Sequence, residues 1–169
     1  VKFMARILVA YASKKGSTTE IAQAIGKEIR VAGHLVDVTE MKSVSSLESY
    51  NAVVIEEPFY MGSIMADVGK FIARYEVALT QVPVAAFAVG LAPLGKDPAD
   101  RDNAMKKLQK TLEPLTPLAT TIFAGRLDLT KLSWFQKWIT EKVKSPVGDF
   151  RDWTAIAAWA RELPAKMGI

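Results

Sequence analysis

The residues best suited to chemistry form a hydroxyl-rich loop near the start of the chain. Residues Ser13–Thr18 read SKKGST, and they lie between the apolar run Arg6–Tyr11 and a stripe of apolar residues at helical spacing between Ile21 and Ile29. Hydroxyl groups and backbone N–H groups at the positive start of a helix favour an anion. The loop therefore predicts an anion site, most naturally for a phosphate group.

Two common phosphate-binding patterns are absent from this loop. It contains neither G-x-x-x-x-G-K-[ST] nor G-x-G-x-x-G, so neither a nucleoside-triphosphate loop nor a dinucleotide fingerprint is supported. Ser17 with Glu20 three residues later predicts a capping box at the helix start. A well-capped first helix with no ligand is the alternative that this loop leaves open.

Two further segments offer groups that a flat ligand could contact. Residues 56–62 follow the apolar run 50–55 and combine a fixed backbone angle at Pro58, an aromatic face at Tyr60 and a close approach at Gly62. Residues 90–92 follow the apolar run 82–89 in the same way. Because ligands of open parallel sheets bind beyond the carboxyl ends of the strands, we expect all three segments at one edge.

The pattern of elements predicts how these segments are positioned. Short apolar runs alternate with helical patterns, which favours an α/β fold: a doubly wound sheet of five parallel strands in the order 2-1-3-4-5, with helices on both faces. We predict one domain over residues 1–169. The expected strands are 6–11, 35–38 at an edge, 50–55, 82–89 and 118–123, and the expected helices begin near residues 17, 66, 97 and 152.

Residues 125–148 form an insertion between the fifth strand and the last helix. Trp134, Phe135, Trp138 and Ile139 are interleaved there with lysines. This composition suits an interfacial helix, so we predict a docking surface for a hydrophobic donor, a quinone or an anionic membrane. The alternative is a helix that buries its rings against the sheet edge. We expect the two tryptophans of the last helix, Trp153 and Trp159, to pack in the core.

Composition excludes several classes of protein. The 169 residues include no Cys and a single His, which removes disulfides, thiol catalysis, iron–sulfur clusters and Cys-based zinc sites. We expect His34, in a turn, to be a solvated surface residue. The net charge of +4 points to an anionic ligand or surface, but the basic residues are too dispersed to suggest nucleic acid. No run spans a bilayer and no secretion signal is visible, so we expect a cytoplasmic protein.

The first two segments resemble the flavin-binding loops of the flavodoxin family. Ser13–Thr18 is similar to that family's phosphate loop, Ser/Thr-x-Thr-Gly-x-Thr, with Lys15 in place of one Thr, and Pro58-Phe59-Tyr60-x-Gly62 is similar to its second loop. The resemblance implies noncovalent binding of FMN. By that resemblance the phosphate is held by Ser13, Lys15, Gly16, Ser17 and Thr18, and the ring is bordered by Pro58, Phe59, Tyr60, Met61, Gly62, Gly90, Leu91 and Ala92.

Within the family, the insertion and the segments 91–98 and 148–153 resemble the menaquinone-dependent protoporphyrinogen dehydrogenase branch. This resemblance implies an FMN-dependent oxidoreductase that passes electrons between a planar organic donor and a quinone, with the chemistry on the flavin. The alternative is an electron carrier that docks protein partners, although such carriers are usually acidic. A receiver-like regulatory domain would need acids at the end of the first strand, where this chain has none.

Glu56 and Glu57 depart from the family pattern, which has small residues at these positions. A carboxylate that faces the flavin should oppose negative charge on the reduced ring and lower its potential. Alternatively, both side chains face solvent and only the backbone contacts the cofactor. A third alternative is that the two acids weaken FMN binding, and the sequence does not decide among them.

Overall fold

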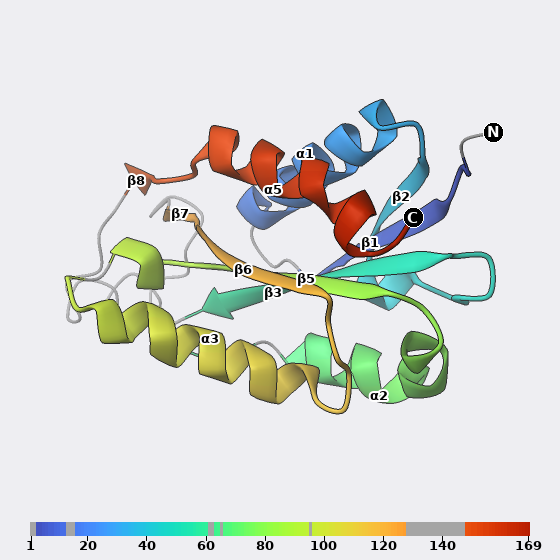
Figure 1. Ribbon diagram of the computed structural model, residues 1–169. Helices are drawn as coiled ribbons and strands as arrows, with labels where there is room; N and C mark the ends of the chain where they lie inside the picture. The colour runs from blue at the N-terminus through green and yellow to red at the C-terminus, as the bar shows by residue number, and fades with distance from the viewer. Residues whose placement is uncertain (1–2, 13–15, 61–62, 65, 95, 128–147) are drawn as a thin grey trace.

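The protein is a twisted parallel sheet covered by helices on both faces (Figure 1). The computed structural model describes residues 3–12, 16–60, 63–64, 66–94, 96–127 and 148–169. The parallel strands run in the order β2-β1-β3-β5-β6, which confirms the predicted topology. Their bounds are β1 Arg6–Tyr11, β2 Leu35–Glu40, β3 Ala52–Tyr60, β5 Val84–Gly90 and β6 Ala119–Ala124. The short strand β4, Ser63–Ile64, pairs antiparallel with the end of β3.

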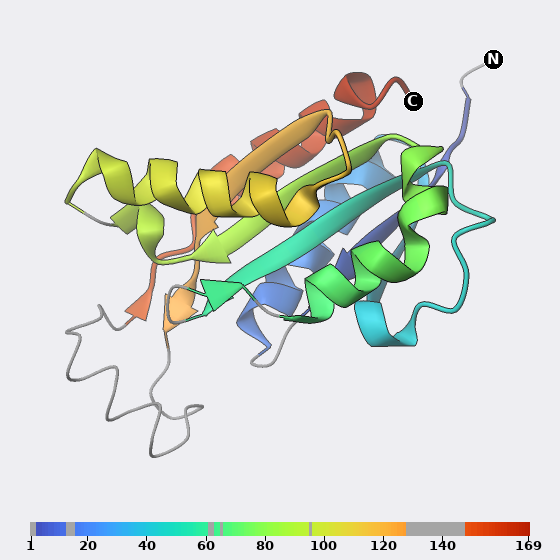
Figure 2. The same ribbon diagram turned by 90° about the horizontal axis from the view of Figure 1, so that it is seen from below.

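The helices form two layers, one on each face of the sheet (Figures 1 and 2). Helices α1 (Ser17–Val31) and α5 (Trp153–Lys166) cover one face, and α2 (Ala66–Thr80) and α3 (Pro98–Leu112) cover the other. Short 3-10 helices occur at Met41–Ser43 (η1) and Ala92–Leu94 (η2). Because side chains of a strand alternate between faces, Ala52 and Val54 of β3 pack beneath α1 and α5, whereas Val53 and Ile55 pack beneath α2 and α3.

Strand β3 is longer than the sequence predicted. We expected a strand over 50–55 followed by a turn, but β3 continues to Tyr60. Its pairing with β1 ends at Ile55, and its pairing with β5 continues to Pro58, opposite Val89. Two acids and a proline are typical of the end of a strand. Both helix layers cover this segment, however, and it remains part of the sheet. Glu56 and Glu57 are therefore strand residues.

A two-stranded ribbon follows the end of β6. Strands β7 (Arg126–Leu127) and β8 (Gly148–Asp149) pair antiparallel. The Gly125 N–H donates to Gly90 O at 3.0 Å, and the Phe150 N–H donates to Gly125 O at 3.2 Å. These bonds join the ribbon to the ends of β5 and β6. The residues between β7 and β8, including Trp134, Phe135, Trp138 and Ile139, lie outside the described residues.

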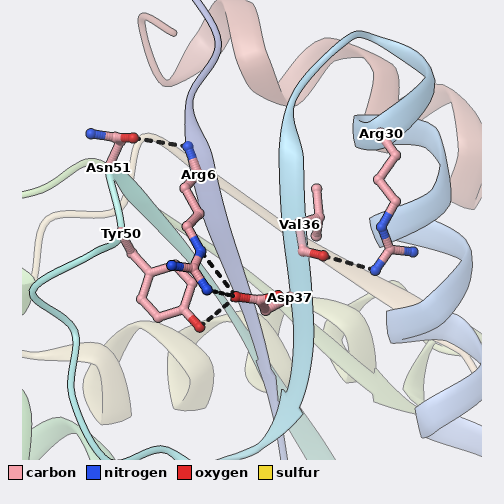
Figure 3. Close-up of polar contacts among 6 residues, drawn as sticks. All are labelled: Arg6, Arg30, Val36, Asp37, Tyr50 and Asn51. Atoms are coloured by element: carbon pink, nitrogen blue, oxygen red, sulfur yellow. Dashed lines mark hydrogen bonds and ion pairs between the residues drawn. The ribbon is translucent and has the colours of Figure 1, made fainter.

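A polar cluster joins the edge strand β2 to the N-terminal end of β1 (Figure 3). Asp37 Oδ2 accepts from Tyr50 Oη and from Arg6 Nη2, each at 2.8 Å. These bonds, with Tyr50 contributing most, hold the pKa of the Asp37 carboxyl below its usual range. Arg6 N donates to Asn51 Oδ1, and Arg30 joins α1 to β2 through Val36 O at 2.8 Å. The cluster contributes to the scaffold.

Two expectations about single residues were wrong. His34 is only 5% exposed, and its Nδ1 accepts a hydrogen bond from the Ala5 N–H at 3.1 Å. The turn that carries it lies against the start of β1, where a ring nitrogen satisfies a buried backbone donor. Trp153 is 43% exposed rather than packed in the core. The expectation for Trp159 is confirmed, since its ring packs against Phe87 and Phe123.

Candidate functional site

The predicted ligand segments meet at one edge because of strand order. The chain leaves β1 through α1 on one face and leaves β3 through α2 on the other, so the strand order reverses between these two neighbours. The carboxyl ends of β1, β3 and β5 lie side by side there. This is the position at which open α/β sheets bind ligands.

The start of α1 provides the anion-binding part of the site. Gly16 is the N-cap, with φ of 76°, and the first intrahelical bond runs from the Glu20 N–H to Gly16 O at 3.4 Å. The predicted capping box requires Ser17 as the N-cap, but Gly16 is the N-cap and Ser17 is the first helical residue, while Glu20 Oε2 binds Arg151. A glycine has no side chain with which to cap the helix. The first backbone N–H groups of an α-helix have no acceptor within the helix. Because the N-cap here supplies no side-chain acceptor, this helix start suits an anion.

The floor of this part of the site is Glu56, which the sequence did not assign to it. The side chain is 0% exposed and lies on the α1 and α5 face of the sheet. The Ala12 N–H donates to Glu56 Oε2 at 2.7 Å, and the side chain of Thr18 also hydrogen-bonds to the carboxyl group. Among the described residues, Oε1 has no partner within normal hydrogen-bond distance. Burial, assisted by neighbouring Glu57, raises the pKa of Glu56 to about 8.

Glu57 lies on the other face, toward α2 and α3. It is also 0% exposed, and neither of its carboxyl oxygens has a hydrogen-bond partner within the part of the chain described. Thr111 of α3 is near enough to lower its pKa slightly, but the Thr111 hydroxyl donates to Lys107 O at 3.1 Å. Burial dominates and raises the pKa of Glu57 to about 8. The alternative in which both acids face solvent is therefore wrong.

The second and third segments contact each other directly. Pro58 is buried and Phe59 is half-buried, both within β3. A Cβ atom at Gly90, the last residue of β5, would lie 2.9 Å from the Phe59 Cβ atom, so only glycine permits this close packing. Leu91 and Ala92 are half-buried and lead into η2. Tyr60 ends β3, whereas Ser13, Lys15, Met61 and Gly62 lie outside the described residues.

Arg151 joins the ribbon β7–β8 to the first turn of α1, a contact that no local pattern of residues indicates. Its guanidinium forms a bidentate pair with Asp149, at 2.8 Å through Nε and 2.6 Å through Nη2, and also binds Glu20. It stacks over the Trp153 ring, 4.7 Å from the ring centroid. The pair with Arg151 lowers the pKa of Asp149 to about 2. This cluster lies beside the anion-binding part of the site.

The described residues fit the FMN that the sequence resemblance implies. The first turn of α1 begins at a glycine and offers backbone donors to a phosphate. The contact of Phe59 with Gly90 brings together the two segments expected to border a flat ring. The pKa of Glu56 leaves its carboxyl uncharged at neutral pH, so it places no negative charge beneath a phosphate there.

Comparisons with known proteins show which family the chain belongs to. Protoporphyrinogen IX dehydrogenase [quinone] of Escherichia coli K12 is 23% identical over 172 residues, which cover 94% of each chain. Flavodoxin 2 of Bacillus cereus superimposes with a TM-score of 0.60 at 17% identity, over 97% of this chain and 98% of the other. An archaeal flavodoxin gives a TM-score of 0.59, also at 17% identity, over 97% and 99%. Residues 8–154 match the flavodoxin domain family, so the chain belongs to that family, and FMN is its cofactor.

Proposed function

We propose that this protein is an FMN-dependent oxidoreductase that passes electrons from a planar organic donor to a quinone. The observation that carries the proposal is the alignment with the protoporphyrinogen IX dehydrogenase [quinone] of Escherichia coli, which extends over 94% of both chains. Such an alignment includes the connection between β7 and β8. A flavodoxin-like electron carrier does not need that connection, which makes it the natural place for a donor or quinone to dock.

The position of the ribbon supports this proposal. Gly125 binds Gly90 O, so the ribbon begins beside the segment that borders the ring. The net charge of +4 counts Glu56 and Glu57 as ionised, and the protein is more basic when both are neutral. A basic protein suits an anionic donor or an anionic membrane surface. No helix among the described residues has the length and apolar character needed to cross a membrane.

The protein's own residues bind and orient the cofactor. Thr18 and the first turn of α1 hold the phosphate, while Phe59, Leu91 and Ala92 border the ring. When bound, FMN supplies the capacity to accept two electrons from one partner and donate them to another. In the overall reaction the donor loses two electrons and two protons, and the quinone gains both and becomes a quinol.

An anaerobic turnover assay tests the proposal. Holoprotein is mixed with protoporphyrinogen IX and a short-chain quinone, and porphyrin fluorescence and quinone absorbance are followed together. We expect turnover that needs the donor, the quinone and FMN, with apoprotein as the control. Reduction of a carrier-type protein acceptor, without any reduction of the quinone, would instead favour the alternative function of electron carrier.

A second experiment tests the insertion as a docking surface. We expect Trp134→Ala with Trp138→Ala to retain FMN absorbance and the melting temperature, but to lose turnover with a lipophilic quinone and to bind anionic liposomes less. Salt should weaken liposome binding by the unaltered protein, because the lysine contribution is screened. A large drop in melting temperature with loss of flavin would show that these rings belong to the core.

A further inference from the structure

The carboxyl group of Glu56 touches both ends of the loop that joins β1 to α1. Ala12, which directly precedes the loop, donates its backbone N–H to Oε2 at 2.7 Å. Thr18, in the first turn of α1, hydrogen-bonds to the same carboxyl through its side chain. The carboxyl is 0% exposed, and Oε1 has no partner within normal hydrogen-bond distance among the described residues. A side chain from β3 thus forms the floor beneath the phosphate-binding start of α1.

The protonation state of Glu56 decides what Thr18 can do. An ionised carboxylate only accepts hydrogen bonds, so it would take the single proton of the Thr18 hydroxyl. A neutral carboxyl is a weaker acceptor than a carboxylate, so it competes less strongly for that proton. The Thr18 hydroxyl then keeps its proton for a phosphate oxygen. An ionised Glu56 would also repel a phosphate dianion across a buried, weakly screened distance.

Within the described part of the chain, the charged and titratable neighbours of Glu56 offer little to stabilise its ionised form. Glu57, next on the same strand, favours the neutral state of Glu56. Glu20 on α1 pairs with Arg151, Tyr11 ends β1, and the β5 neighbour Phe87 carries no charge. The α5 layer contributes Trp159. No ion pair with Glu56 is present among the described residues.

We propose that Glu56 is a positioning residue of the phosphate site, which holds Ala12 and Thr18 as a neutral carboxyl, and that FMN binding therefore takes up a proton when Glu56 is ionised in the apoprotein. The inference deepens the FMN-binding part of the proposed function and is independent of the electron donor and acceptor. Loss of FMN at alkaline pH would follow directly from this arrangement.

Apoprotein titrated with FMN at constant ionic strength between pH 7 and pH 9 tests this role. With a pKa of about 8 in the apoprotein, the dissociation constant should rise about tenfold over this range. The second ionisation of a phosphate group occurs near pH 6, which is below this range of pH. Glu56→Gln mimics the neutral carboxyl. At pH 7 its affinity for FMN should stay within a few-fold of that of the unaltered protein, and its dissociation constant should change less than about twofold between pH 7 and pH 9. Riboflavin, which lacks the phosphate, should show a weaker pH dependence.

Glu57→Gln is the matched control, because Glu57 is equally buried on the other face. It should keep a strong pH dependence for FMN that begins at a lower pH, because Glu57 helps to raise the pKa of Glu56. Calorimetry of the unaltered protein at pH 8, in buffers of different ionisation enthalpy, should show uptake of about half a proton per FMN. This measurement decides the question even if Glu56→Gln fails to fold.

Several outcomes would overturn the inference. These are a dissociation constant that is constant with pH, the same pH dependence in Glu56→Gln as in the unaltered protein, loss of FMN binding at every pH in a folded Glu56→Gln variant, or calorimetry without proton uptake. Absence of any FMN binding would overturn both this inference and the proposed function. If FMN binds but the protein does not turn over the donor or the quinone, the inference about Glu56 still holds.

Discussion

The carboxyl group of Glu56 accepts a hydrogen bond from the backbone N–H of Ala12 at 2.7 Å, which joins the outer part of β3 to the end of β1. The bond lies directly beneath the start of α1, because Thr18 contacts the same carboxyl. The candidate phosphate site therefore rests on a buried side chain from another strand.

Thr18→Val should weaken FMN binding far more than riboflavin binding. A hydrogen bond to a charged group contributes about 1.5 to 3 kcal/mol, and only FMN carries the phosphate. Fluorescence titrations of the apoprotein with both ligands give the comparison. Thr19→Val, in the same helical turn, is the control. An equal loss of affinity for FMN and for riboflavin would mean that Thr18 stabilises the fold and does not bind the phosphate.

Glu57→Gln should stabilise the apoprotein increasingly as pH rises. The usual pKa of 4.5 applies to the unfolded chain, and the folded value is about 8. Between these values the folded protein holds a proton that the unfolded chain has lost, so the stability of the unaltered protein falls with rising pH, by on the order of 1 kcal/mol per pH unit. Glu57→Gln lacks this contribution of Glu57 to the loss of stability. Urea unfolding at pH 5, 6.5 and 8 measures the difference.

The same exchange at the exposed residue Glu113 provides the control for that series. We expect Glu113→Gln to follow the pH dependence of the unaltered protein. If Glu57→Gln also follows it, then Glu57 is ionised in the folded protein and must have gained a partner.

Gly90→Ala should destabilise the protein and weaken flavin binding. The added Cβ atom would lie 2.9 Å from the Phe59 Cβ atom, so β3 and β5 must separate or Phe59 must shift. Overpacking of this kind costs about 1 to 3 kcal/mol. Gly69→Ala in α2 meets nothing within 4 Å and should be stabilising by up to about 1 kcal/mol. Equal melting temperatures for the two variants would refute the close packing.

Arg151→Lys should lower stability more than the same change at Arg161. The Arg151 side chain is 5% exposed and its bidentate pair with Asp149 cannot be reproduced by an ammonium group. We expect a loss of about 1 to 3 kcal/mol. Arg161, 66% exposed, pairs with Glu28, and such a pair contributes at most about 1 kcal/mol. Denaturant unfolding compares them, and a smaller loss at Arg151 would contradict the account.

The sequence predicted the topology because each parallel strand is a short apolar run covered on both faces. It also predicted a helix start at residue 17, and Gly16 and Thr18, which we propose to lie at the phosphate, are found at the start of α1. The strand expected over 35–38 lies at an edge of the sheet, as predicted, and extends to Glu40. These features depend on local patterns of residues, and local patterns survive in the folded chain.

The remaining features depend on contacts between distant segments. Glu56 and Glu57 suggested the end of a strand, but neighbours on both sides bury them within β3. His34 suggested the surface, and its role as an acceptor for Ala5 depends on how the turn meets β1. The link from Arg151 to Glu20 spans 131 positions of sequence. No spacing rule relates such residues, so the sequence alone could not reveal them.

Amide chemical shifts during a titration with FMN test the central claim most directly, namely that the cofactor binds at the carboxyl edge with its phosphate at α1. We predict that FMN shifts the amides of Gly16, Thr18, Leu91 and Ala92, and leaves Arg6 and Asp37 at the opposite end of the sheet unchanged. Riboflavin should shift Leu91 and Ala92 but have little effect on Gly16 and Thr18. Shifts confined to other parts of the sheet, or equal effects of both ligands at Gly16 and Thr18, would contradict the claim.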